Sequence, residues 1–247
     1  WGYNNYGQLG DGTTTTRYSP VNITSKFSLS AGETIIKVEL GTYHSSALTS
    51  EGRLFTWGYN NYGRLGDGTT TTRYEPVDIT SKFGLNLGEE IVSVSLEGSH
   101  SSALTSEGRL FTWGWNNYGQ LGDGTTTNSY SPVNITANFS LTADEKIIDF
   151  SLGSSHSAAL TNEGRLFTWG YNTYGQLGDG TSTTRYLPVD ITTAFTLGTG
   201  ELITSVELGS SHSAALTSEG NLFVWGNNSN GQLGDGSANN KLSPLKI

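Results

Sequence analysis

The sequence predicts an all-β protein built from tandem copies of one 56-residue unit, and two observations support this prediction. First, a Trp-Gly pair recurs every 56 residues, and all five prolines and all four histidines each keep a single phase of the same period. Second, glycine (33 of 247 residues), threonine, serine and asparagine are abundant, and no apolar helical period lasts through two turns. Repeats of this kind form one supersecondary unit each, and the units pack on their neighbours.

Four short strands are expected in each unit. In the first complete unit they are Ile35–Leu40, His44–Thr49, Arg53–Trp57 and a segment that starts near Pro76. Ser50–Gly52 supplies a tight turn between the second and third strands, with glycine available for positive φ. Proline fits an outer edge strand, where the missing N–H leaves no partner unpaired. Four antiparallel strands, repeated radially, describe the blade of a β-propeller.

The period divides residues 1–247 into a single repeat domain without linkers. We expect an N-terminal partial blade over residues 1–33, with one short helical turn within Ser25–Gly32, and then four full blades over residues 34–89, 90–145, 146–201 and 202–247. Trp1 falls where a third strand should end, and the last unit drifts from the others. Since terminal repeats are often atypical, we expect the chain to be a fragment of a longer array whose terminal blades can associate with other chains.

Composition excludes several kinds of site and partner. The chain has no cysteine, which rules out disulfides, thiolate metal sites and a cysteine nucleophile. Its 13 basic and 22 acidic residues give a net charge of −9, which argues against nucleic-acid binding. No apolar run approaches the roughly 18 residues that membrane insertion needs.

The repeated histidines and aspartates favour structural roles over chemistry. Radial repetition spreads equivalent side chains apart, whereas a metal ion needs convergent ligands, so no metal or organic cofactor is expected. We expect the histidines to bond the backbone at a turn between strands. These residues are His44, His100, His156 and His212. The aspartates of the Leu-Gly-Asp-Gly motifs are expected to cap their loops, and the acidic pairs Glu89-Glu90 and Asp144-Glu145 are expected to be solvated.

The tryptophans that end each third strand are expected to be buried between blades. These structural residues are Trp57, Trp113, Trp169 and Trp225. Serine next to histidine, as in His44-Ser45, does not make a catalytic pair, because adjacent strand residues point to opposite faces. We therefore expect no catalytic residues and no enzyme activity.

Candidate partner-binding residues lie where the units differ from one another, since scaffold positions are fixed by packing. The first two units differ at only 13 of 56 positions. Variable positions fall on the inner strand and on the turn before each histidine: Lys37, Glu39, Thr42, Tyr43, Ser93, Ser95, Ser99, Asp149, Ser151, Ser155, Ser205, Glu207 and Ser211.

The tyrosines leave two interpretations open. Eleven of the twelve fall at three phases of the repeat, represented by Tyr59, Tyr62 and Tyr74. They can pack between blades with their hydroxyls bonded. Alternatively they form an exposed ladder of aromatic rings, a surface suited to binding protein or sugar.

The motifs resemble the repeat of the regulator of chromosome condensation family. The resemblance is clearest at Leu152–Gly153, His156–Thr161, Gly164–Gly170 and Gly175–Gly180, and it covers almost the whole chain. It implies a β-propeller, classically of seven blades. The family includes exchange factors for a small GTPase, a secreted inhibitor of β-lactamases and long bacterial surface proteins, and the Asn-, Thr- and Ser-rich composition here is most similar to the last group.

From this resemblance and the variable positions we expect a non-catalytic module, secreted or on the cell surface, that binds a protein partner. Three alternatives remain: a self-assembling structural filament, a sugar-binding lectin and an exchange factor for a small GTPase. A lectin predicts similar pockets in every blade, and a filament predicts that terminal blades pair between copies.

Overall fold

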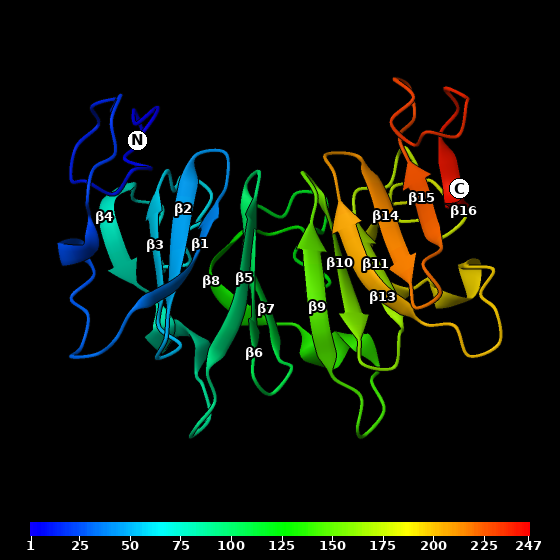
Figure 1. The fold of residues 1–247 in the computed structure, drawn as a ribbon, viewed down its shortest axis with the longest axis horizontal. Coiled ribbons are helices and arrows are strands. Elements are labelled where there is room, and N and C mark those ends of the chain that lie inside the picture. Colours follow the sequence, from blue (N-terminus) through cyan, green and yellow to red (C-terminus); the bar gives the residue numbers. More distant parts are fainter. The chain divides into compact units, whose positions relative to one another are not determined.

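The computed structural model describes all of residues 1–247 and shows four separate four-stranded antiparallel sheets (Figure 1). In every sheet the hydrogen-bonded order of the strands is their order along the chain. These sheets are propeller blades, and they confirm the predicted all-β class. No helix is long and apolar enough to cross a membrane.

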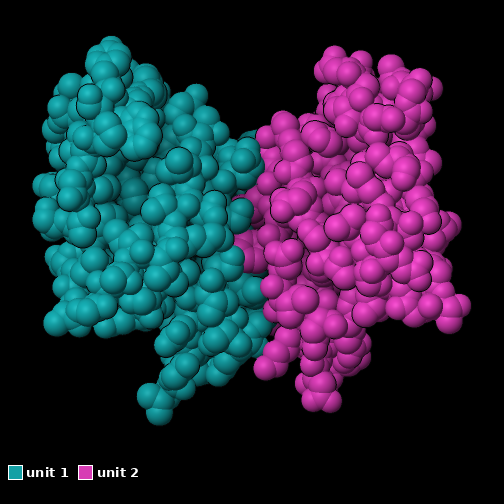
Figure 2. All heavy atoms as spheres, viewed as in Figure 1, with its two compact units in different colours: residues 1–115, 128–134 teal, residues 116–127, 135–247 magenta.

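The chain divides into two compact units, which Figure 2 shows in different colours. Unit 1 comprises residues 1–115 and 128–134, and unit 2 comprises residues 116–127 and 135–247. Each unit contains two of the four sheets.

Unit 1 begins with a loop and a short 3-10 helix, η1 (Thr24–Lys26). Its first sheet consists of β1 (Ile35–Leu40), β2 (His44–Thr49), β3 (Leu54–Gly58) and β4 (Arg73–Asp78). A second 3-10 helix, η2 (Thr80–Phe83), leads to the second sheet, which consists of β5 (Ile91–Glu97), β6 (His100–Thr105), β7 (Leu110–Gly114) and β8 (Ser129–Asn134).

Unit 2 repeats this plan. After η3 (Thr136–Phe139) its first sheet consists of β9 (Ile147–Leu152), β10 (His156–Thr161), β11 (Leu166–Gly170) and β12 (Arg185–Asp190). After η4 (Thr192–Ala194) its second sheet consists of β13 (Ile203–Leu208), β14 (His212–Thr217), β15 (Leu222–Gly226) and β16 (Lys241–Lys246).

Three local boundaries differ from those expected. The third strand is Leu54–Gly58 rather than Arg53–Trp57. The fourth strand begins at Arg73 rather than near Pro76, because the chain already pairs with β3 through Gly58 and Arg73. The register then shifts before Val77 pairs with Thr56, so Pro76 lies in an irregular stretch of an edge strand, where no ladder bond is lost. The helical turn of the first unit lies at Thr24–Lys26, one residue earlier than the segment expected to hold it.

The core lies between consecutive sheets. In unit 1, Leu48 and Leu54 of the first sheet share a buried cluster with Val94 and Leu96 of the second. We call the face that carries Leu48 and Leu54, and their equivalents in other sheets, the trailing face. The opposite face, which carries Val94 and Leu96 or their equivalents, is the leading face.

A phenylalanine at the end of each 3-10 helix, or directly after it, packs into this core. In unit 1 the ring of Phe83 from η2 stands edge-on to Phe111 and Trp113, with centroids 5.0 and 5.7 Å apart. Unit 2 repeats the triad with Phe195, Phe223 and Trp225. The 3-10 helix therefore belongs to the leading face of the sheet that follows it.

Candidate interaction surface

A single buried asparagine organises the glycine-rich loop that follows each third strand. Asn60 is fully buried, and its amide Nδ2 donates to Asp67 Oδ1, Thr69 O and Thr71 O at 3.0–3.1 Å. Its Oδ1 accepts from the backbone N–H of Leu65 at 3.0 Å. The same buried asparagine recurs at Asn4, Asn116, Asn172 and Asn228. Sequence reasoning missed this role, although the constant phase of these asparagines is a usable signal.

The aspartate of the same loop is held by its own threonine and by a cation. Asp67 Oδ1 accepts from the N–H and hydroxyl of Thr69, which is the expected Asx-type cap, and Oδ2 accepts from Arg73 Nε at 2.7 Å. In the first loop, burial would raise the pKa of Asp11, but bonds from Thr13 and Arg17 outweigh it and lower the pKa to about 2. This aspartate is therefore a charged acceptor for its threonine and its arginine at neutral pH.

Four of the five glycine-rich loops are each bonded to the next sheet through one backbone carbonyl. The carbonyl of Arg64 accepts both Trp113 Nε1 and Ser101 Oγ at 2.9 Å. The carbonyls of Gln8, Gln120 and Gln176 make the same pair of bonds to the Trp and Ser of the following sheet. All four structural tryptophans, Trp57, Trp113, Trp169 and Trp225, are 0–3% exposed.

The histidines join sheets through serine hydroxyls, which corrects the expectation that they bond the backbone. His44 Nε2 lies 3.0 Å from Ser101 Oγ, and His156 Nε2 lies 3.1 Å from Ser213 Oγ. Both rings, like that of His100, are fully buried, whereas His212 is partly exposed. Serine occurs at this point of every repeat, and the two bonds lie within unit 1 and within unit 2.

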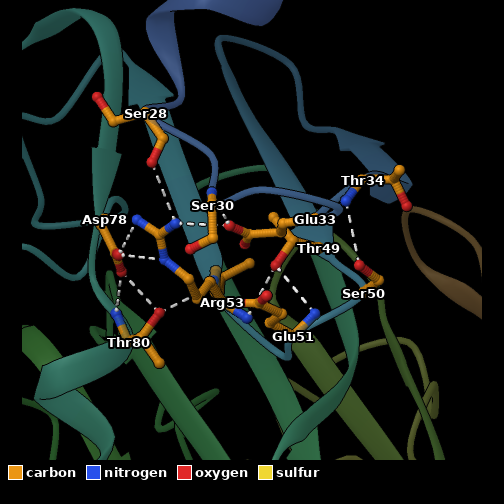
Figure 3. Close-up of polar contacts among 11 residues, drawn as sticks. Ser28, Ser30, Glu33, Thr34, Thr49, Ser50, Glu51, Arg53, Asp78 and Thr80 are labelled. Carbon is orange, nitrogen blue, oxygen red and sulfur yellow. Dashed lines mark hydrogen bonds and ion pairs between the residues drawn. The ribbon is translucent and has the colours of Figure 1, made fainter.

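A buried carboxylate repeats at the opposite end of the sheets, and this corrects a second expectation. In the first sheet Glu33 accepts from the N–H of Ser30 at 2.8 Å and pairs with Arg53 Nη1 at 2.9 Å (Figure 3). Arg53 also reaches Asp78. Glu89, Glu145 and Glu201 are buried at the equivalent positions, so one member of each acidic pair that was expected to be solvated is a structural group.

The pKa values of these carboxyls follow from their contacts. Burial would raise the pKa of Glu89, but hydrogen bonds from Arg109 and Thr105 outweigh it and lower the pKa to about 2. The pKa of Glu33 is lowered mainly by hydrogen bonds from Thr49 and the backbone of Ser30. No group of three or more His, Asp or Glu side chains is placed to hold a metal ion.

The predicted partner-binding positions of the inner strands contact one another between neighbouring sheets. Lys37 Nζ lies 3.3 Å from Val94 O, 3.5 Å from Ser93 Oγ and 3.0 Å from Glu39. In unit 2, Ser151 Oγ bonds Glu207 and the N–H of Leu208. Ser95, Asp149 and Ser205 are partly buried on the same strands. Lys37 and Ser151 thus bridge neighbouring sheets within their own units, while Glu207 is exposed.

The turns before the histidines lie at the same end of the sheets as the glycine-rich loops, because His44 pairs with Gly58. Tyr43 on the first of these turns is 40% exposed, and Thr42 beside it is also exposed. The equivalent turns carry Ser99, Ser155 and Ser211, which are partly buried.

Tyrosines gather at this end of unit 1 in what we call the tyrosine patch, which consists of Tyr3, Tyr6, Tyr43, Tyr59, Tyr62 and Trp115. The ring of Tyr6 lies 4.5 Å from Tyr59, 5.3 Å from Tyr43 and 6.2 Å from Tyr3. Tyr62 and Trp115 lie 6.1 Å apart. Tyr3, Tyr43 and Tyr62 are 37–51% exposed. Tyrosines of the third phase have the other role: Tyr74 and Tyr130 lie against Gly7 and Gly63 of the preceding loop.

A buried arginine lies beneath the tyrosine patch. Arg64 is 2% exposed, and its guanidinium carbon lies 5.0 Å from the centroid of Tyr59 and 5.7 Å from that of Tyr62. Its nitrogens donate to Gly98 O, Asn61 Oδ1 and Ser99 Oγ. Burial lowers its pKa below the usual 12.5. The equivalent residues of the other glycine-rich loops are glutamines, namely Gln8, Gln120, Gln176 and Gln232, so only this loop places a cation against its own tyrosines.

Four-stranded blades joined through a Trp-Gly motif and a histidine turn define a class of β-propeller repeat. The chain belongs to the regulator of chromosome condensation (RCC1) repeat family, whose profile matches residues 1–48, 51–104, 107–160, 163–216 and 219–247. A second profile of the same repeat matches residues 35–64, 91–120, 147–176 and 203–232.

Curated relatives and solved structures agree with this assignment. The ultraviolet-B receptor UVR8 of Arabidopsis thaliana is 34% identical over the whole chain, which spans 52% of that receptor. The probable E3 ubiquitin-protein ligase HERC4 of Homo sapiens is 36% identical over 86% of the chain and 19% of the ligase. The chain thus spans about half or less of these relatives. Human WBSCR16 superposes with a TM-score of 0.80 at 29% identity, covering 99% of this chain and 60% of that one.

The yeast protein RCC1 (Prp20), whose structure was solved bound to Kap60, shares the fold. It superposes with a TM-score of 0.70 at 24% identity over 86% of this chain and 49% of that one.

Proposed function

We propose that this chain is a protein-binding propeller module and that the tyrosine patch of unit 1 is its contact surface. The observation that carries the proposal is a set of six aromatic rings, three of them well exposed. Four rings meet around Tyr6, and buried Arg64 joins them to the pair Tyr62 and Trp115. Tyrosine and tryptophan supply large contact area and lose little side-chain entropy on binding. The rigid loop beneath them limits the ordering cost further.

A solved structure of the same fold supports a binding role. The solved structure of yeast Prp20 is described as bound to Kap60, and its binding to Gsp1p and histones is described in a second study. No convergent catalytic set is present in the tyrosine patch, which offers hydroxyls and rings without a carboxylate or histidine within the group. The patch is suited to recognition rather than to acid–base chemistry.

A site-specific photo-crosslinking experiment tests the proposal. A crosslinking amino acid replaces Tyr43 or Tyr62 in the full chain, and a matched control replaces Leu87, which is fully exposed outside the patch. We expect the two patch positions to capture a protein in the cells that produce this chain, and the Leu87 position not to capture it. Equal capture at all three positions contradicts the proposal.

The captured protein is then purified and its affinity measured directly. Tyr62→Ala should weaken binding by about tenfold or more, as truncation of an interface aromatic commonly does. If instead a glycan array binds the chain and the same substitution abolishes that signal, the lectin alternative replaces this proposal.

We also propose that the module acts outside the cell or on its surface. The acidic, cysteine-free, Asn- and Thr-rich composition supports this location. Labelling of intact cells with an antibody against the chain tests it, and signal that appears only after the cells are broken open contradicts it.

A further inference from the structure

One arginine of this chain has no acidic partner, and it lies beneath the tyrosine patch. Arg64 is 2% exposed, its Nη1 and Nη2 donate only to the neutral oxygens of Gly98, Asn61 and Ser99, and its Nε has no hydrogen-bond partner. Every other arginine pairs with an aspartate or a glutamate: Arg17, Arg53, Arg73, Arg109, Arg165 and Arg185. A buried charge without an opposite charge is costly, so its presence needs a reason.

The fold does not require this charge. Glutamine stands at the equivalent position of the other glycine-rich loops, and Gln120 and Gln176 are as fully buried as Arg64. Their backbone carbonyls bond the Trp and Ser of the next sheet in the same way as the carbonyl of Arg64. A neutral side chain therefore suffices at the junction between loop and sheet, and the positive charge is an added property of one loop.

Unit 2 contains an aromatic group without a cation, which provides an internal comparison. The rings of Tyr118 and Tyr171 lie 4.7 Å apart, and those of Tyr171 and Tyr174 lie 6.2 Å apart. On the loop that carries Tyr171 and Tyr174, Gln176 takes the place of Arg64. Adjoining aromatic rings thus occur in both units, and the buried cation is what distinguishes the tyrosine patch.

The acidic residues of the surrounding loops do not neutralise Arg64. Asp11 and Asp67 each pair with an arginine of their own loop at 2.7 Å. Glu97 precedes the turn that Arg64 contacts, but it follows Leu96 of the leading face, so its side chain belongs to the trailing face of its sheet. The loop of Arg64 is bonded to the leading face of that sheet. A negative charge at the tyrosine patch has to come from another molecule.

We propose that the tyrosine patch binds an acidic segment of its protein partner and that Arg64 selects this segment. The inference rests on the proposed function and adds the chemistry of the partner. The guanidinium lies over the rings of Tyr59 and Tyr62, and an aromatic ring carries its partial positive charge at its edge. Ring edges and tyrosine hydroxyls are therefore the groups that meet a carboxylate, and the hydroxyls donate hydrogen bonds to it.

The carboxylate does not have to touch Arg64 to be attracted by it. The guanidinium carbon lies 5.0 and 5.7 Å from the two ring centroids, so a carboxylate in contact with the outer side of the rings lies roughly 9 Å away. Across rings that exclude water, the Coulomb attraction at this distance strengthens binding by about tenfold or more. The net charge of −9 opposes this only weakly, because distant charges are screened beyond about 8 Å at physiological salt.

Selection from a displayed library of short random peptides tests the inference with the full chain. The unmodified chain and Arg64→Gln serve as separate baits, and circular dichroism checks that the variant is folded. Arg64→Gln is a matched variant because the other loops carry glutamine at this position. We expect aspartate and glutamate to be enriched among the peptides that the unmodified chain retains and not among those that Arg64→Gln retains. Tyr62→Ala should release the acidic peptides, which places them at the tyrosine patch.

Affinities measured at several salt concentrations separate an effect of charge from an effect of packing. An acidic peptide should bind Arg64→Gln about tenfold more weakly than it binds the unmodified chain. Arg64→Lys keeps the charge and should recover most of this loss. Added salt should reduce the difference between the unmodified chain and Arg64→Gln, because it screens the attraction. A difference that stays constant with salt, and that Arg64→Lys does not reduce, assigns Arg64 a packing role and overturns the inference.

Failure of the inference and failure of the proposed function give different results. Peptides that depend on Tyr62 but show no acidic enrichment overturn the inference and leave the protein-binding function in place. Acidic peptides that bind Arg64→Gln as tightly as the unmodified chain do the same. Binding of heparin, a sulfated polysaccharide, in place of acidic peptides overturns the inference because the anion then belongs to another class of molecule. If no peptide and no crosslinked protein binds at the tyrosine patch, the proposed function fails as well.

Discussion

A buried asparagine side chain holds each glycine-rich loop closed through several hydrogen bonds to the loop backbone. Asn172 donates to Asp179 Oδ1, Thr181 O and Thr183 O and accepts from the N–H of Leu177, all at 2.9–3.1 Å. One side chain thus satisfies groups that lie up to 11 residues further along the chain. Buried polar groups that lose such partners are costly to leave in place.

We expect Asn172→Ala to lower the free energy of unfolding by about 2–4 kcal/mol, because several buried groups lose their partner at once. Urea denaturation measures this loss. Thr173→Ala is the matched control, since Thr173 is exposed next to it and should change stability by less than about 0.5 kcal/mol. Equal effects of the two substitutions would show that the asparagine does not organise the loop.

Buried histidines make stability depend on pH. Burial lowers the pKa of His44 and of His100 from 6.5 to about 3. Between these values the unfolded chain binds protons that the folded chain does not bind, so stability falls as pH falls from 6.5 toward 3. Each histidine contributes a slope of up to about 1.4 kcal/mol per pH unit.

Urea denaturation at a series of pH values across this window measures the slope. The carboxyl of Glu89, with its pKa lowered from 4.5 to about 2, adds to the loss only below its unfolded value. The histidine effect therefore appears first as the solution is acidified. A free energy of unfolding that stays constant from pH 6.5 to 4.5 is incompatible with two neutral buried rings.

At the scale of the element, the third strand and its tryptophan anchor each sheet to the preceding loop. All five residues of β7 are buried, and Trp113 also donates to the carbonyl of Arg64. We expect Trp113→Ala to cost about 3–5 kcal/mol, as other large-to-small core substitutions do. Chemical denaturation followed by circular dichroism measures it. Trp1→Ala is the control, because Trp1 is 73% exposed, and a similar loss for both would place the anchor elsewhere.

Much of this architecture could be predicted at the level of the element, and the reason is the repeat. Strand positions follow from apolar runs and glycine turns, and the four sheets are where those signals place them. Burial on the first strand could not be predicted in the same way. Val38 and Val94 occupy the same phase, yet one is exposed and the other buried, because burial depends on a neighbouring sheet and not on the local sequence.

The candidate site also combines features that the local sequence predicts with features that depend on the fold. The exposure of Tyr43 is consistent with its position on a variable turn, but the tyrosine patch depends on rings from residues 3 to 115 meeting in space. The buried role of Glu33 does have a sequence signal, since glutamate recurs at the same phase as Glu89, Glu145 and Glu201. Hydrogen bonds between side chains of successive sheets, such as that of His44 with Ser101, leave no local pattern in the sequence.

At the scale of the whole molecule, the acidic charge sets which partners are compatible. A net charge of −9 on 247 residues opposes binding to a polyanion. We expect no shift of duplex DNA in an electrophoretic mobility assay at physiological salt. A basic protein of similar size serves as the positive control, and a salt-sensitive shift caused by this chain would mean that its few cations gather into a usable surface.

The fastening of each loop to the next sheet has a consequence for how the chain folds. Nearly every 56-residue repeat has the same carbonyl acceptor and the same Trp and Ser donors. A loop that contacts the wrong sheet can therefore form the same hydrogen bonds as in the correct pairing. Tandem domains of such similarity are prone to misassembly while they fold. Arg64 distinguishes one junction, since its guanidinium fits between Tyr59, Tyr62 and the Gly98–Ser99 turn, whereas the other junctions have glutamine. Arg64 therefore favours the correct pairing of its loop with the next sheet during refolding. We expect Arg64→Gln to leave the native structure intact and to lower the yield of refolded protein.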